Sequence, residues 1–236
     1  MSRAKAWFLG GGPGAPDLLT VRAARVIAEA DIVIWGARLV MEEAVTENAR
    51  PGAELIPWPP ASMDELFAAY DRAKAEDLVV ARLLGGDPAV FVDMGQEIER
   101  CRELGLPHEI VPGVGALSAA AALVGGELVT ARSERTLLIV SPKAELEPLA
   151  RDGATMAIYM SGEKGEEVQR RLLAGGYPPD TPCAIVHSAG WPEEAVVRCP
   201  LDRLAESLAD PRFARRTLVI AGSALPGGAE GAESAS

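Results

Sequence analysis

The sequence predicts an α/β fold made of two tandem α/β domains. Short apolar runs alternate with amphipathic helical patterns along most of the 236 residues, as in parallel sheets flanked by helices. Three apolar runs of the first half end directly at glycine-rich loops, at residues 10–17, 85–88 and 112–115. Glycine and charge interrupt the apolar pattern at residues 125–135, which predicts the domain boundary there.

The first domain, residues 1–125, is predicted to hold a parallel-rich sheet. Continuous apolar runs at 32–35 and 78–84 are typical of strands buried on both faces. Shorter strands are expected at 6–9 and 109–111. Helical spacing of apolar residues predicts helices at 20–30, 39–45, 63–75, 90–104 and 115–124, the last of them buried.

The second domain, residues 126–225, repeats the alternation with shorter elements. Strands are expected at 137–140, 156–160, 184–187 and 218–221, and helices at 163–174 and 201–208. The tail, residues 226–236, is small, polar and acidic, so we expect it to be disordered.

The composition excludes several classes of protein. A formal net charge of −11 argues against a sequence-independent nucleic-acid binder. No apolar run approaches the ~20 residues of a membrane helix, and the first residues lack a signal-peptide core, so a cytoplasmic protein is expected. The chain has only two histidines, and its cysteines are far apart, so neither a metal centre nor a disulfide framework is predicted; the cysteines are Cys101, Cys183 and Cys199.

The three glycine-rich loops predict one ligand site. They follow strands of one parallel sheet, and ligands bind such sheets at the carboxyl ends of the strands. Residues 10–14 carry glycines but break the dinucleotide pattern, because Ala15 stands where a third glycine is expected. Asp31 lies at the wrong end of its strand for a ribose contact, and no Gly-Lys-Ser/Thr phosphate loop exists. An adenosine-type ligand held by main chain fits better.

These loops resemble the motifs of a known family. Residues 10–20 (GGGPGAPDLLT), 85–88 (GGDP) and 111–114 (VPGV) look like the three loops of the tetrapyrrole methylases, in the same order. The resemblance covers residues 6–225. It implies a methyltransferase that uses S-adenosyl-L-methionine, releases S-adenosyl-L-homocysteine, and binds the cofactor in a cleft between its two domains.

Residues 186–194 (VHSAGWPEE) are similar to the precorrin-4 C11-methyltransferase branch, which includes its cobalt-precorrin counterpart. The expected function is therefore C-methylation of a precorrin in cobalamin biosynthesis, most specifically of precorrin-4 at C11. Ala15, Phe91-Val92 and Gly115 depart from the family pattern. Methylation of a different substrate by a paralogue, or cofactor binding without catalysis, remain as alternatives.

The resemblance also implies site residues. The expected cofactor contacts are Pro13, Gly85, Gly86, Asp87, Gly115, Ala116, Met160 and Ala189. Asp87 is interpreted either as the polar anchor of the cofactor or as a helix N-cap before Val90. Met160 is interpreted either as a cofactor contact or as packing at a strand end.

The acceptor carries many carboxylates, so a local basic rim is expected on this acidic protein. Rim candidates are Arg22, Arg38, Arg132, Arg135, Lys143 and Lys164, with Arg38 and Arg132 preferred. Trp191 is expected either to stack on the acceptor or to pack at a core or dimer contact. His187 is either a general base or a packed histidine. No catalytic residue is assigned, and the resemblance implies a homodimer.

Overall fold

The computed structural model describes residues 2–130, 135–150 and 153–225. The chain divides after Ala116 into two compact units. The boundary expected at Gly125 lies at the other end of helix α5 (Ala116–Val124), whose buried residues pack in the second unit. The tail at 226–236, expected to be disordered, lies outside the described residues. In the described part of the chain, every helix is too short or too polar to cross a bilayer.

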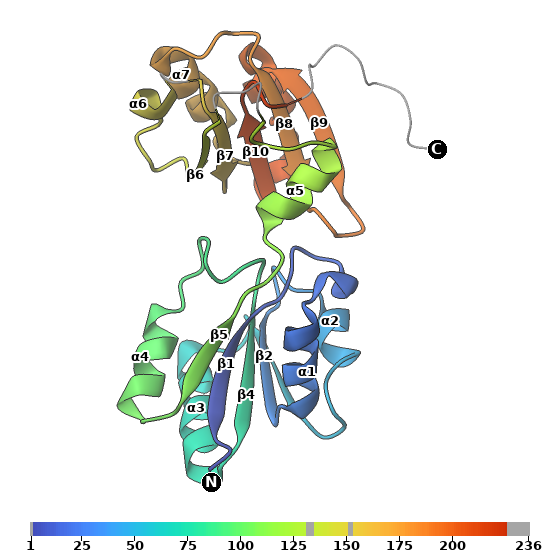
Figure 1. Cartoon of the computed structure of the whole chain (residues 1–236), viewed down its shortest axis with the longest axis vertical. Coiled ribbons are helices and arrows are strands. Elements are labelled where there is room, and N and C mark those ends of the chain that lie inside the picture. The colour runs from blue at the N-terminus through green and yellow to red at the C-terminus, as the bar shows by residue number, and fades with distance from the viewer. Residues whose placement is uncertain (1, 131–134, 151–152, 226–236) are drawn as a thin grey trace. The chain divides into compact units, whose positions relative to one another are not determined.

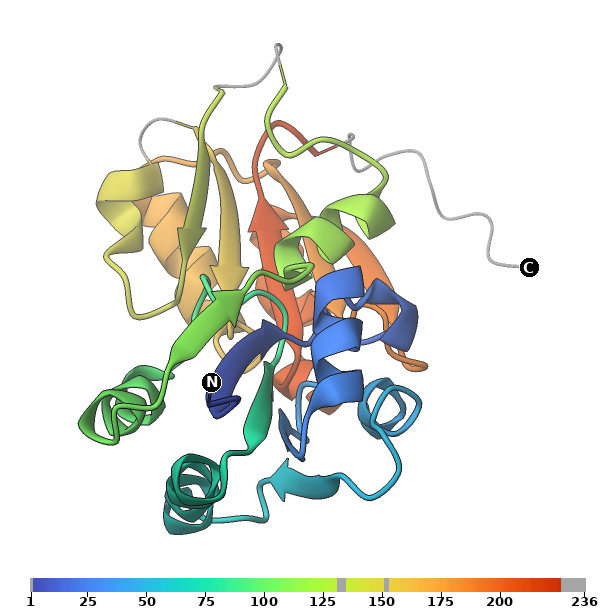
Figure 2. The same ribbon diagram turned by 60° about the horizontal axis from the view of Figure 1, so that its bottom comes forward.

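The first unit is a parallel five-stranded sheet between two layers of helices (Figures 1 and 2). The strand order is β3-β2-β4-β1-β5, and every pairing is parallel. Its strands are β1 (Lys5–Gly10), β2 (Ile32–Gly36), β3 (Glu54–Trp58), β4 (Val79–Leu84) and β5 (His108–Val111), and its helices are α1 (Val21–Glu29), α2 (Glu42–Thr46), α3 (Met63–Glu76) and α4 (Gly95–Glu103).

Alternate residues of each strand enter two separate cores. Phe8 and Ile34 pack with α3 and α4, whereas Leu9 and Val33 pack with α1 and α2. Ser62 caps the start of helix α3: its hydroxyl accepts from the Glu65 amide while the Glu65 carboxylate accepts from the Ser62 amide. With both faces covered, only the ends of the strands are left for a ligand.

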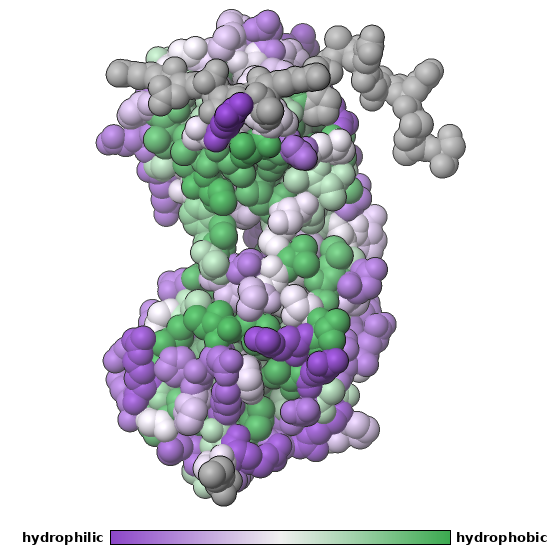
Figure 3. All heavy atoms as spheres, in the orientation of Figure 1, coloured by the Kyte–Doolittle hydropathy of each residue, from purple (hydrophilic) through white to green (hydrophobic). Residues whose placement is uncertain are grey.

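The second unit is a mixed sheet of order β6-β7-β10-β8-β9, in which only β6 and β7 pair in parallel. Helices α6, α7 and α8 cover one face, and α5 packs on the other. Ile139 of β6 remains 43% exposed, and Figure 3 shows apolar residues gathered on this unit. The remaining elements are β6 (Leu137–Val140), α6 (Leu146–Ala150), β7 (Thr155–Tyr159), α7 (Gly165–Gly175), β8 (Pro182–His187), β9 (Ala195–Pro200), α8 (Leu204–Ser207) and β10 (Thr217–Ala221).

The predicted α/β class and the parallel first sheet are confirmed. The helix expected over 90–104 was wrong at its start, because α4 begins at Gly95. Phe91 has a φ of +53°, which an α-helix cannot contain. Helix α5, expected to be buried, buries only Ala120 and Val124.

Candidate functional site

The three glycine-rich loops meet at the carboxyl ends of the strands of the first sheet. They follow β1, β4 and β5, and these strands are neighbours in the order β4-β1-β5. The first two loops are joined directly: the Gly86 amide donates to Gly12 O at 2.7 Å and the Gly12 amide donates to Gly86 O at 3.3 Å. The Gly11 amide also donates to Leu84 O at 2.7 Å. The predicted convergence is therefore present within this unit.

Close backbone approach explains why glycine stands in these loops. A Cβ on Gly10 would lie 2.8 Å from Gly86 O, and a Cβ on Gly113 would lie 2.7 Å from the Gly10 Cα. Atoms at such distances overlap, so the backbones could not approach with any larger residue. The result is a cradle of bare main chain, which we call the glycine cradle, formed by Gly10, Gly86 and Gly113.

Asp87 lies beside this cradle, in a turn. Its Oδ1 accepts from the Ala89 amide at 2.8 Å, and its carbonyl accepts from the Val90 amide at 3.1 Å. The helix N-cap interpretation is wrong, because α4 begins only at Gly95. A Cβ on Gly115 would lie 3.7 Å from the Asp87 Cβ, so the second and third loops are in contact there.

The other expected cofactor contacts of this unit surround the same loops. Pro13 is half-buried in the first loop, directly after the Gly12–Gly86 pairing. The Ala116 amide nitrogen lies 3.5 Å from where a Gly86 Cβ would be. Gly85 is covered by Leu39, because a Cβ there would lie 2.5 Å from the Leu39 Cβ. The structure thus brings together Pro13, Gly85, Gly86, Asp87, Gly115 and Ala116.

Met160 and Ala189 belong to the second unit. Met160 follows β7 with a φ of +56° and is 62% exposed, which contradicts strand-end packing. Ala189 follows β8 and packs against the core on the α5 side of the sheet. Their contribution to the cofactor site stays a prediction.

The substrate candidates differ in their surroundings. Arg38 is exposed after β2, and within the described residues it has no ion pair. The Arg216 guanidinium lies 4.0 Å from the centre of the Trp191 ring and pairs with Glu193, so one face of that ring is already covered. Lys164 pairs with Glu167 at 3.6 Å. Arg132 lies outside the described residues.

His187 is a packed residue. It is 5% exposed, its Nδ1 lies 3.2 Å from Thr217 Oγ1, and its Nε2 lies 3.1 Å from Ser188 Oγ. The ring meets Phe213 edge-on at 5.6 Å between centroids. Burial, followed by the nearby Arg216 charge, lowers the pKa of His187 below its ordinary 6.5. The packed interpretation is supported, since both ring nitrogens have partners.

This buried histidine predicts acid sensitivity of the second unit. A group whose pKa is lowered by folding binds protons more readily when unfolded, so its stabilising effect is complete above pH 6.5 and falls as pH decreases below it. We expect the melting temperature to fall between pH 7.5 and about 5.5, and His187→Gln to flatten that dependence. Thermal melts of both proteins across this range provide the measurement. Parallel pH profiles would contradict the prediction.

A buried ionic cluster in the first unit was not predicted. Glu97 of α4 accepts from Arg82 Nε at 2.9 Å, from Arg82 Nη2 at 3.2 Å and from the Tyr70 hydroxyl at 2.6 Å. Arg82 and Glu97 are each only 3% exposed. Burial, then the Glu97 charge, raises the pKa of Tyr70 well above its ordinary value. The sequence holds one signal of this cluster: Arg82 stands inside the apolar strand β4, and a buried charge needs a partner.

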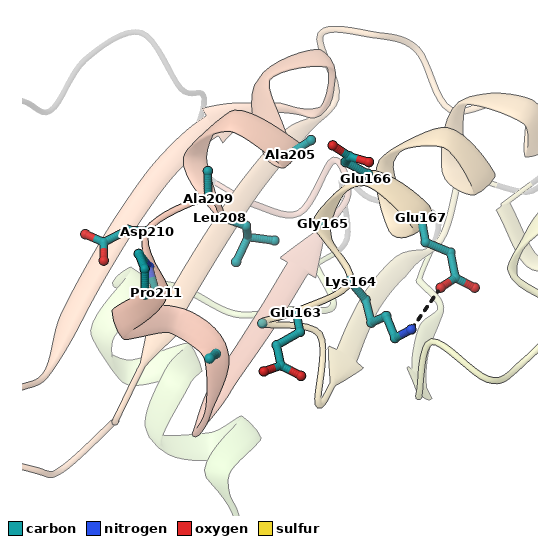
Figure 4. Close-up of a pocket in the computed structure, with 12 residues that line it drawn as sticks. Glu163, Lys164, Gly165, Glu166, Glu167, Ala205, Leu208, Ala209, Asp210 and Pro211 are labelled. Atoms are coloured by element: carbon teal, nitrogen blue, oxygen red, sulfur yellow. Dashed lines mark ion pairs between the residues drawn. The ribbon is translucent and has the colours of Figure 1, made fainter.

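A separate pocket of about 550 Å³ lies in the second unit, where the start of α7 faces the segment after α8 (Figure 4). Four acidic residues and one lysine line it, namely Glu163, Glu166, Glu167, Asp210 and Lys164. An acceptor rich in carboxylates is disfavoured by such a lining. Of the expected substrate or cofactor residues, only the rim candidate Lys164 lies there, so the glycine cradle remains the candidate site.

The chain is similar to proteins of one family. The sequence model of the tetrapyrrole (corrin/porphyrin) methylases matches residues 5–205. A precorrin-4 C(11)-methyltransferase of Rhodococcus erythropolis is 35% identical over 228 residues, 93% of this chain and 91% of that protein. A relative of the same name from Pseudomonas aeruginosa is 34% identical over 227 residues, with 93% and 90% coverage.

The fold of this chain is also similar to solved structures of methyltransferases that act on tetrapyrroles. A cobalt precorrin-4 methyltransferase matches with a TM-score of 0.89 and 29% identity, over 95% of this chain and 97% of that one. A uroporphyrin-III C-methyltransferase of Thermus thermophilus, complexed with S-adenosyl homocysteine, matches with a TM-score of 0.77 and 30% identity, over 93% and 98%.

Proposed function

We propose, because this chain belongs to the tetrapyrrole (corrin/porphyrin) methylase family, that it transfers a methyl group from S-adenosyl-L-methionine to C11 of precorrin-4 in cobalamin biosynthesis. Methyl transfer as the class of reaction follows from the family. The acceptor is supported by relatives named precorrin-4 and cobalt-precorrin-4 methyltransferases. The donor is supported by the solved relative complexed with S-adenosyl homocysteine.

The glycine cradle is the observation that supports binding of S-adenosyl-L-methionine. A Cβ on Gly10 or Gly113 would collide with main-chain atoms of the neighbouring loops, so only glycine lets the three loops meet here. Main-chain groups of these loops beside one carboxylate, that of Asp87, suit a ligand that offers ribose hydroxyls, adenine nitrogens and an ammonium group. We assign Pro13, Gly85, Gly86, Asp87, Gly115 and Ala116 to this ligand, with Met160 and Ala189 as further contacts.

The donor would supply an electrophilic methyl group: an electron-rich precorrin carbon bonds to it as the methyl–sulfur bond breaks, S-adenosyl-L-homocysteine is released, and the acceptor gives up one proton. The residues of the chain therefore need only to bind, align and shield the reactants. Main chain of the cradle holds the donor without adding charge. Gly115 provides no hydroxyl at the start of α5, and one missing hydrogen bond weakens binding by about 1 kcal/mol. Arg38 and Arg132 are proposed to bind acceptor carboxylates, and Trp191 to contact the acceptor ring.

The proposal is tested by ligand binding followed by product analysis. S-adenosyl-L-homocysteine at about 100 times its dissociation constant should stabilise the native protein by about 2.7 kcal/mol, seen as a higher melting temperature. Mass spectrometry of precorrin-4 incubated with protein and methyl donor should show the mass of one added methyl group, with C11 as its position. Absence of any thermal shift at millimolar ligand would contradict the proposal.

Two other outcomes identify the alternatives. A thermal shift with methylation of another tetrapyrrole would identify a paralogue with a different substrate, which the departure at Gly115 favours. A thermal shift without methylation of any tetrapyrrole would identify a cofactor-binding module. Labelled methyl donor, incubated with a panel of precorrins, separates the two.

We further propose a homodimer in the cytoplasm that binds neither nucleic acid nor membrane. Apolar residues gather on the second unit in Figure 3, and Ile139 of β6 is half-exposed; both observations support a protein contact of this unit. The negative net charge supports the absence of nucleic-acid binding. Light scattering after size-exclusion chromatography gives the oligomeric state, and Ile139→Glu should shift a dimer towards monomer.

A further inference from the structure

The residue before helix α5 cannot cap it with a side chain. The helix begins at Ala116, so Gly115 stands at the N-cap position and offers no side-chain oxygen. Serine, threonine, asparagine and aspartate are preferred there, because their side chains accept from the amide of the second or third helical residue. The second residue of α5 is Leu117. The first amides of a helix have no partner within it, so an acceptor must come from elsewhere.

The hydroxyl of Tyr159 is an acceptor of this kind. The Leu117 amide donates to Tyr159 Oη at 3.2 Å. Tyr159 is the last residue of β7 and pairs with Leu218 of β10 in the sheet register. Its side chain and that of Leu117 both pack against the core on the α5 side of the sheet. Backbone pairing and side-chain packing therefore hold the hydroxyl in a fixed position.

The capped end of α5 continues the third glycine-rich loop. Leu117 directly follows Gly115 and Ala116, which we assign to the cofactor. The Ala116 amide nitrogen lies 3.5 Å from where a Gly86 Cβ would be. A Cβ on Gly115 would lie 3.7 Å from the Asp87 Cβ. A shift at the start of α5 would therefore move the third loop against the second and misplace contacts of both.

We propose that Tyr159 is a positioning residue for the cofactor: its hydroxyl caps α5 and thereby holds the third loop in the conformation that binds S-adenosyl-L-methionine. The inference rests on the proposed function, since it needs the cofactor to bind at these loops. It also accounts for Gly115, a departure from the family pattern, because an acceptor from β7 replaces the oxygen that an N-cap side chain usually supplies. A cap that only stabilises the helix would leave cofactor affinity unchanged, so the test measures both quantities.

The first variant is Tyr159→Phe, which removes only the hydroxyl. We expect the dissociation constant of S-adenosyl-L-homocysteine, measured by calorimetric titration, to rise about fivefold, the effect of one lost cap. The melting temperature should fall by about 2–4 °C. Tyr177→Phe is the matched control in the same unit, because the Tyr177 hydroxyl donates to Ala154 O and its ring packs in the core on the other face of the sheet. The control should lower the melting temperature and leave the dissociation constant unchanged.

A second variant tests whether the hydroxyl acts as a cap. Gly115→Ser supplies an N-cap oxygen, and a Cβ there would lie no closer than 3.7 Å to its nearest neighbour, the Asp87 Cβ. The gain in S-adenosyl-L-homocysteine affinity from Gly115→Ser should be about fivefold larger in Tyr159→Phe than in wild type, since the wild-type Leu117 amide already has its acceptor. Gly115→Ala adds a methyl group without an oxygen, so its effect should be equal in both backgrounds.

Three results would overturn the inference. A lower melting temperature with a wild-type dissociation constant in Tyr159→Phe would show a cap that serves stability alone. Equal gains from Gly115→Ser in both backgrounds would show that the Tyr159 hydroxyl does not act through the start of α5. Both results require a wild-type protein that binds S-adenosyl-L-homocysteine, and they leave the proposed function standing. A wild-type protein that does not bind this ligand would overturn the proposed function and the inference together.

Discussion

Glu97→Ala is expected to lower the free energy of unfolding by about 3–5 kcal/mol, because it leaves the Arg82 charge buried without a partner. Arg82 is 3% exposed, so water cannot replace the lost carboxylate. The Tyr70 hydroxyl loses its acceptor at the same time. Denaturant unfolding followed by tryptophan fluorescence measures the effect, since Trp7, Trp35 and Trp58 all report on the first unit.

Glu99→Ala on the same helix is the matched control. Its partner Arg102 is 63% exposed, and Glu99 itself is 60% exposed, so the loss should stay below about 0.5 kcal/mol. The double variant Arg82→Met, Glu97→Leu should be more stable than Glu97→Ala, because it removes both charges. Equal losses of unfolding free energy for Glu97→Ala and Glu99→Ala would mean that the buried ion pair contributes no more to stability than the exposed one.

Gly113→Ala is expected to damage both stability and cofactor binding. The added Cβ would lie 2.7 Å from the Gly10 Cα and would also overlap Gly86 O, so the loops must separate. Overpacking of this kind destabilises by about 1–3 kcal/mol. We expect S-adenosyl-L-homocysteine affinity to fall at least about tenfold, since a displaced cradle misplaces several contacts at once. Calorimetric titration and denaturant unfolding measure the two effects.

Gly126→Ala is the control for adding a methyl group to a glycine. A Cβ there would meet nothing within 4 Å, so the free energy of unfolding should change by less than about 1 kcal/mol. If Gly113→Ala behaved like Gly126→Ala in both measurements, the close approach of the loops would not matter for binding.

The buried parts of the fold were predictable because their apolar patterns and lengths favour one kind of element. The short apolar run at 32–35 predicted a covered strand, found as β2 (Ile32–Gly36), and the helical spacing of Ala23, Val26 and Ile27 predicted the buried face of α1. The strands that the sequence did not predict, β3 and β9, are both at sheet edges. Edge strands tolerate proline and charge, and Pro57 and Arg198 removed the usual signal.

The site was predictable as far as its backbone. Glycines after three strands of one sheet imply an open edge, and the structure brings these loops together. The side-chain contacts near the site could not be predicted from the sequence pattern. The partnership of Arg82 with Glu97 depends on how α4 lies on β4, and the left-handed φ of Phe91 depends on the path of the loop between them. Neither is a local property of the sequence.

The strand orders have a consequence for synthesis on the ribosome. Strand β1 is made first, yet it pairs with β4 and β5, which are made later. Strand β10 joins β7 to β8 in the middle of the second sheet, and it is the last strand of the described residues. Until residue 221 has emerged, β7 and β8 lack the strand that joins them in the complete sheet. Unpaired edges can add a strand from another chain, so we expect the second half to be the more prone to aggregation before its synthesis is complete.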